Sequence, residues 1–126
     1  MARFLLISGA TLCMLAVVLG AFAAHGLKSQ LSEYALGVFQ TGVTYQFYHG
    51  LALILFGILQ TQGYQLKLSG WLALIGCVFF SGSLYLLALT GVKWFGPITP
   101  IGGTLFIASW LSFIWQVAKT KHVKVD

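Results

Sequence analysis

Four long apolar stretches alternate with short, more polar segments along the chain. They run from Phe4 to Ala24, from about Phe39 to Gln60, from Leu68 to Thr90 and from Pro100 to Ala118. Each is close to the roughly 20 residues that a helix needs to cross about 30 Å of hydrocarbon. Backbone amides cannot stay unpaired in that medium, so helices are the expected conformation. The pattern predicts an all-α membrane protein with four transmembrane helices in a single domain, residues 1–126.

The connections that follow the second and third stretches are short. One runs from Thr61 to Lys67 and the other from Gly91 to Pro97. Short links make consecutive helices antiparallel neighbours, so the four helices should form an antiparallel bundle. Thr99 followed by Pro100 is typical of an N-cap with proline at the first helical position, which predicts the start of the fourth helix.

The segment between the first two stretches carries the spacing of one helical face. From Ser29 onward, apolar residues recur at i, i+3, i+4, i+7 and i+8, and these are Leu31, Tyr34, Ala35, Val38 and Phe39. Ser32, Glu33 and Gln40 fall on the opposite side. This pattern predicts a short amphipathic helix over about residues 29–38, which either lies in the membrane interface or leads directly into the second transmembrane helix.

The first apolar stretch also has an alternative interpretation as a signal peptide. Arg3 precedes an apolar run that ends in Ala21-Phe22-Ala23, which resembles an A-x-A cleavage site. The run is longer than the roughly 7–15 residues usual in such a peptide. Its small residues repeat every four positions, as in packed membrane helices, and these are Ala16, Gly20 and Ala24. We therefore expect a retained helix.

Composition agrees with a membrane protein and disfavours nucleic acid as a partner. Hydrophobic residues make up 59% of the chain and charged residues 7%, whereas a soluble domain has roughly 25% charged residues. The net charge of +5 comes from seven basic residues that form no stripe interleaved with exposed aromatic residues. The expected partner is the lipid bilayer, and a second copy or another membrane protein remains open.

The basic residues are distributed unevenly between the two predicted sides of the membrane. One side holds Arg3, Lys67, Lys119, Lys121 and Lys124, and the other holds Lys28 and Lys93. Because cytoplasmic loops carry the excess of Lys and Arg, both termini are predicted to lie in the cytoplasm.

Polar side chains inside the apolar stretches cost free energy in lipid, so they should face protein or water. At 100° per residue, the second helix turns Gln46 and His49 to a polar face and its large apolar residues to the other. His49 should therefore point into the bundle. In the third helix, a thin ridge recurs every four residues, formed by Ser69, Ala73, Cys77, Ser81 and Tyr85.

A candidate polar cluster follows from these faces: His25, Tyr45, Gln46, His49, Ser81, Ser83, Tyr85 and Thr99. Much of it should lie in the outer half of the membrane. Two interpretations remain open. The cluster either lines a small polar cavity that is open to the outer face, or it is a hydrogen-bonded network that fixes the register of the helices.

The sequence offers little evidence for a bound cofactor or for catalysis. His25 ends the first helix, whereas His49 lies about 15 Å into the second, too far apart in depth to ligate one haem. A zinc site would be short of ligands, and Cys13 and Cys77 lack metal-ligand spacing. No G-x-S-x-G element surrounds Ser81 or the other serine of the cluster. We expect no cofactor, no metal and no catalytic residue. Whether the two cysteines are close stays open.

Several motifs occur in a fixed order along nearly the whole chain. They are Gly20-Ala21-Phe22-Ala23-Ala24-His25-Gly26-Leu27, Thr41-Gly42 with Tyr45-Gln46 and His49, Phe80-Ser81-Gly82-Ser83-Leu84-Tyr85, and Thr99-Pro100-Ile101-Gly102-Gly103. Together they resemble the YgdD-like family of small bacterial inner-membrane proteins, which is similar to the eukaryotic transmembrane protein 256. One departure is Ala23, where the family usually has glycine. The resemblance implies a four-helix protein of the bacterial inner (plasma) membrane, and it implies no activity.

Two functional expectations from different classes follow. The first is a non-enzymatic membrane protein with a structural or partner-binding role. The alternative is a transporter or binding protein for a small solute, an ion or a lipid, which would use the polar cluster around His49.

Overall fold

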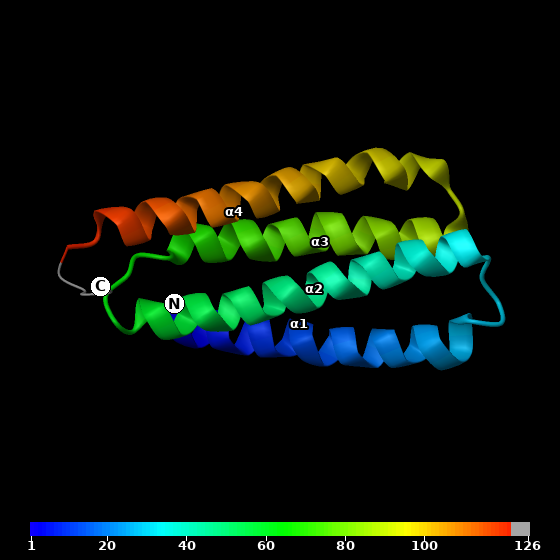
Figure 1. The fold of residues 1–126 in the computed structure, drawn as a ribbon, viewed down its shortest axis with the longest axis horizontal. Helices are drawn as coiled ribbons and strands as arrows, with labels where there is room; N and C mark the ends of the chain where they lie inside the picture. Colours follow the sequence, from blue (N-terminus) through cyan, green and yellow to red (C-terminus); the bar gives the residue numbers. More distant parts are fainter. Residues whose placement is uncertain (122–126) are drawn as a thin grey trace.

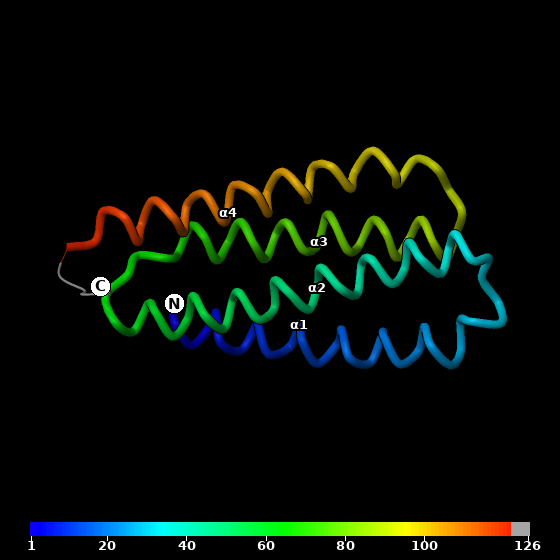
Figure 2. The backbone as a smooth tube through the Cα atoms, in the orientation of Figure 1, coloured from blue at the N-terminus to red at the C-terminus, as the bar shows by residue number. Residues whose placement is uncertain are grey.

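A computed structural model of the protein describes residues 1–121 and consists almost entirely of helix. Four long helices run antiparallel (Figure 1): α1 (Ala2–Phe22), α2 (Glu33–Gln60), α3 (Lys67–Thr90) and α4 (Thr99–Lys119). A π-helical turn, η1 (Ala23–Leu27), continues α1, and a 3₁₀ helix, η2 (Lys93–Ile98), precedes α4. The tube in Figure 2 shows the first residue at the same end of the molecule as the end of α4. Lys124 lies outside the described residues.

All four helices are long and apolar enough to cross a membrane, and the predicted all-α fold with four spanning helices is confirmed. The predicted spans agree with the helices, although each helix begins somewhat earlier than its span. The difference is largest for α2, whose 28 residues make it about 42 Å long. Because the hydrocarbon is about 30 Å thick, α2 is about 12 Å longer than a perpendicular crossing requires.

The amphipathic segment predicted over residues 29–38 is not a separate helix. Residues 28–30 form a turn and residue 31 a bend, and the helix that begins at Glu33 continues to Gln60 without a break. Ser32 sets this start, because its side chain accepts a hydrogen bond of 3.1 Å from the backbone N–H of Ala35. Of the two alternatives, the structure has the one in which the amphipathic face leads directly into the second helix.

The helices are arranged so that each packs mainly on its neighbours in sequence. α2 and α3 form the centre, α1 packs along α2, and α4 packs along α3 (Figure 1). α2 and α3 are accordingly more buried than the two flanking helices. The outer faces of α1 and α4 carry large apolar side chains that are exposed, among them Ile7, Val17, Ile107 and Leu111, as lipid-facing surfaces require.

Glycines allow these helix pairs to lie backbone to backbone. A Cβ at Gly9 of α1 would lie 2.6 Å from the carbonyl oxygen of Gly50 in α2. A Cβ at Gly102 of α4 would lie 2.3 Å from the backbone nitrogen of Phe80 in α3. Small residues at such crossings permit the close van der Waals packing that holds membrane helices together. α1 thus packs closely against α2.

Two clusters of buried apolar side chains flank the middle of the bundle. The cluster nearer the termini includes Leu5, Leu53 and Phe56. The cluster nearer the α1–α2 connection is formed by Ala23, Leu27, Phe39 and Ala88. The buried polar residues of α2 lie between these clusters in the sequence, and this is where the candidate site is found.

Candidate polar site between the helices

His49 lies near the middle of α2, roughly 24 Å along the helix from Glu33. The prediction that it points into the bundle is confirmed, since only 5% of its surface is exposed. Its Nδ1 lies 2.9 Å from the carbonyl oxygen of Tyr45, and the indole Nε1 of Trp110 lies 3.1 Å from its Nε2. A carbonyl only accepts and an indole N–H only donates, so the ring is neutral with its proton on Nδ1.

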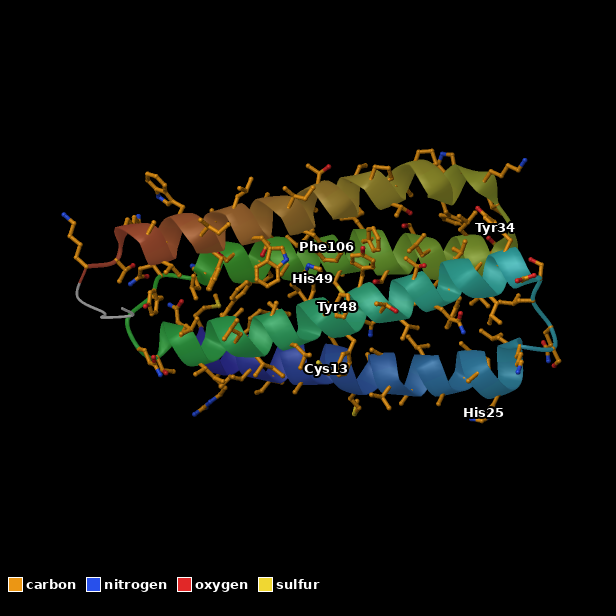
Figure 3. The ribbon with its side chains drawn as sticks, in the orientation of Figure 1. Cys13, His25, Tyr34, Tyr48, His49 and Phe106 are labelled. Atoms are coloured by element: carbon orange, nitrogen blue, oxygen red, sulfur yellow. The ribbon has the colours of Figure 1, made fainter. Side chains whose placement is uncertain are left out.

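Aromatic side chains of α2 and α4 pack against this imidazole (Figure 3). Phe106 stacks on it with 3.5 Å between the ring centroids and 8° between the planes. Tyr45 is nearly parallel to the ring as well, at 6.4 Å. A proton added to Nε2 would remove the acceptor that Trp110 uses. The surroundings therefore favour a neutral ring that joins α2 to α4.

Gln46 joins three helices. Its Nε2 donates to the carbonyl oxygen of Leu12 in α1 over 2.9 Å, and its Oε1 accepts from the hydroxyl of Tyr85 in α3 over 2.6 Å. Close by, the hydroxyl of Ser81 donates to the carbonyl oxygen of Gly42 over 2.7 Å. Both ends of the Gln46 amide are thus occupied, and α1, α2 and α3 are held in one register.

Thr99 and Ser83 join α3 to α4. Ser83 donates to the carbonyl oxygen of Phe80 over 2.9 Å, so the hydroxyl of Thr99, 2.5 Å away, is the donor to Ser83. The prediction of Thr99 as the N-cap of the fourth helix is wrong. Ile98 occupies that position, without a side-chain cap, because η2 leads directly into α4 and Thr99 itself has helical dihedral angles.

The eight predicted residues therefore do not form one cluster. Three groups are present: Gln46 with Tyr85 and Ser81, His49 with Tyr45, and Ser83 with Thr99. His25 stands apart from them, exposed in η1 at the far end of α1 (Figure 3). With α2 beginning at Glu33, His49 lies about midway along its helix. That much of the set lies in the outer half of the membrane stays a prediction.

Sequence reasoning predicted Thr99 but missed the rest of the contribution of α4. Besides Phe106 and Trp110, α4 supplies Ser109, whose hydroxyl donates to the carbonyl oxygen of Ser69 over 2.7 Å. Ser69 in turn donates to the hydroxyl of Ser112 over 2.9 Å. Their spacing could have identified them. Ser109 and Ser112 are three residues apart, and Phe106 and Trp110 are four apart, so each pair lies on one face of a helix.

Metal-ligating residues do not gather in the part of the chain that the structure describes. Over residues 1–121, no three His, Cys, Asp or Glu side chains lie close enough to hold one ion. Cys13 and Cys77 are both free thiols, and Cys13 makes a long contact of 3.9 Å to the carbonyl oxygen of Phe47.

A groove of about 490 Å³ opens beside His49 on the side of the bundle between α2 and α4. Its walls are almost wholly apolar or aromatic, and Phe80 of α3 forms part of them. Tyr45 is its one ring with a hydroxyl group and is 40% exposed. Gly103 lines the groove from α4, where it leaves room for a larger side chain.

Comparison of the sequence with known proteins identifies its family. A profile described as "Protein of unknown function (DUF423)" matches residues 19–103, about two thirds of the chain. The chain belongs to this family. The DUF423 match includes all eight predicted residues, from His25 to Thr99, but ends before Phe106 and Trp110. It agrees with the resemblance to the YgdD-like family, and the family description assigns no molecular function.

Staphylococcal proteins are similar to this DUF423 chain over most of its length. A UPF0382 membrane protein of Staphylococcus haemolyticus is 50% identical over 93% of this chain and 97% of its own. Another from Staphylococcus saprophyticus is 50% identical over 89% and 94%, and one from Staphylococcus aureus is 48% identical over 89% and 93%. No solved structure matches the chain. The relatives are named as membrane proteins, in agreement with the four spanning helices.

Proposed function

We propose that this DUF423 protein is a non-enzymatic membrane protein that acts through contacts with other components of the membrane. One observation carries the proposal: the buried polar residues of the predicted set are all hydrogen-bonded within the chain. These are Gln46, His49, Ser81 and Ser83. Groups that already bond to one another hold helices together, and they are not poised to bind or transform a substrate.

The strength of these bonds suits a structural role. A hydrogen bond between membrane helices contributes only about 0.6–2 kcal/mol. At least one of them, however, joins each neighbouring pair of helices at a defined position. Gln46 joins α2 to α1 and to α3, and Ser83 with Thr99 joins α3 to α4. Together with the close glycine crossings, these bonds favour one register of the four helices.

A second candidate function rests on the groove between α2 and α4. The groove is open to the side, where lipid would lie, and Tyr45 presents a hydroxyl group to it. An apolar chain or small amphiphile could lie there, which would make the chain a binding protein or a transporter for such a molecule. A variant that fills the groove without disturbing the helices therefore distinguishes the two proposed functions.

Gly103→Leu should fill the groove and leave the protein folded. A Cβ at Gly103 meets nothing closer than Phe80 at 3.8 Å, so a larger side chain projects into open space. We expect normal abundance in the membrane, and a strain that carries this variant should compete as well as one with the unchanged protein. Gly37→Leu, at an α2 position with no neighbour within 4 Å, is the matched control. Lost fitness for Gly103→Leu alone, at normal abundance, would favour the second function.

We further propose that both termini face the cytoplasm, in the bacterial inner (plasma) membrane. Arg3 and Lys119 belong to the end of the molecule that holds the N-terminus (Figure 2), whereas Lys28 and Lys93 belong to the other end. The excess of basic residues at the first end supports this orientation. Alkaline phosphatase fused after the last residue should stay inactive, and fused between Lys28 and Ser32 it should be active. The reverse pattern would contradict the orientation.

A further inference from the structure

A second groove, of about 470 Å³, lies at the end of the molecule opposite the termini. It is bordered by the start of α2, the end of α3 and η2, and we call it the end groove. Its rim holds Ser32, Tyr34 and Lys93, and its floor holds Val38, Leu87 and Ala88. None of these residues belongs to the polar site around His49.

The end groove changes from polar to apolar along the membrane normal. The rim residues Ser32 and Tyr34 stand at the very start of α2. Val38 lies about 7 Å further along that helix. If α2, about 42 Å long, is centred in about 30 Å of hydrocarbon, roughly 6 Å projects at each end. Val38 then lies at the hydrocarbon boundary, and the rim lies among the lipid headgroups.

The charge at this end is positive. Glu33 is the single carboxylate in residues 1–121, against two ammonium groups from Lys28 and Lys93. Of the two lysines, only Lys93 borders the end groove. Tyr34 is 74% exposed beside it, and tyrosine is enriched where proteins meet headgroups. A lysine is a suitable point charge for phosphate.

We propose that the end groove binds a phospholipid of the adjacent leaflet. The Lys93 ammonium pairs with the headgroup phosphate, and the first part of an acyl chain lies over Val38, Leu87 and Ala88. The polarity of the groove runs in the same direction as that of the lipid, from charged headgroup to methylene chain, and its cationic rim complements the phosphate. A phospholipid matches both ends at once, whereas a free anion would match only the rim.

Native mass spectrometry of the full chain, purified in detergent with added dioleoylphosphatidylglycerol, tests this proposal. We expect one retained lipid per protein. Lys93→Gln should reduce its occupancy about fivefold, by removing the charge at the rim. Val38→Trp should also reduce it about fivefold, by filling the floor. Lys28→Gln, which removes the other lysine at the same end, is the matched control and should retain the lipid.

Three outcomes would overturn the proposal. Equal losses for Lys28→Gln and Lys93→Gln would indicate diffuse attraction by the positive end of the molecule. Displacement of the lipid by inorganic phosphate would indicate a site for a free anion. Unchanged occupancy in both Lys93→Gln and Val38→Trp would place the lipid elsewhere.

Dioleoylglycerol, which lacks the phosphate, is a control lipid. It should bind equally weakly to the unchanged protein and to Lys93→Gln.

Discussion

Replacing Gly102 with alanine should destabilise the protein by about 3 kcal/mol, the upper part of the range for overpacked sites. The added Cβ would lie 2.3 Å from the backbone nitrogen of Phe80 and 2.7 Å from its Cα. These are backbone atoms of a helix, which no side-chain rotation can move away. α3 and α4 must therefore move apart. The hydrogen bond between Ser83 and Thr99 lies near this crossing, so the same movement should strain it. Equilibrium unfolding by steric trapping in bicelles would measure the loss.

Gly103→Ala provides a strict control for that experiment. It makes the same chemical change at the adjacent position of the same helix, but its Cβ would meet Phe80 at an ordinary 3.8 Å. We expect the free energy of unfolding to remain within about 0.5 kcal/mol of the unchanged protein, the usual range away from special sites. If the two variants lost the same amount, the close crossing at Gly102 would not be what holds α3 and α4 together.

His49→Ala should cost about 2–4 kcal/mol, in the range for large-to-small changes in a packed core. The ring removed stacks on Phe106 at 3.5 Å between centroids and accepts the hydrogen bond from Trp110. Because a hydrogen bond within a membrane contributes only about 1 kcal/mol, most of the loss should come from packing. The same unfolding measurement, together with abundance in the membrane, would show the effect.

His49→Phe separates the two contributions. It keeps an aromatic ring against Phe106 and removes both ring nitrogens, so we expect a loss of about 1 kcal/mol and near-normal abundance. If the proposed function is correct, the fitness of cells that carry either variant should follow the abundance of the variant protein in the membrane. A His49→Phe protein that is abundant but inactive in a fitness competition would instead show that the imidazole has a chemical or binding role.

The spans were predictable from sequence because the length of a membrane helix is set by the bilayer and its composition by the lipid. The start of α2 was harder to predict. The apolar face that begins near Leu31 is continuous into the membrane, and whether such a face bends at the interface depends on local capping. The hydroxyl of Ser32 caps Ala35, so the chain enters the helix there and does not bend again.

The burial of His49 and Gln46 was also predictable, because helical periodicity decides which residues share a face. Their partners were not. Periodicity does not say which neighbouring helix a face meets, and the bonds to Leu12 and Trp110 depend on that choice.

The packing of each helix mainly on its neighbours in sequence has a consequence for biogenesis. The most extensive helix–helix contacts join helices that follow one another along the chain. The α1–α2 hairpin can close at Gly9 and Gly50 as soon as α2 has left the ribosome and entered the bilayer. The α3–α4 hairpin can follow in the same way at Gly102. Each hairpin can thus close by itself, whereas the packing of Leu5 at Gly70 and the hydrogen bond between His49 and Trp110 form only when α3 and α4 have entered the bilayer.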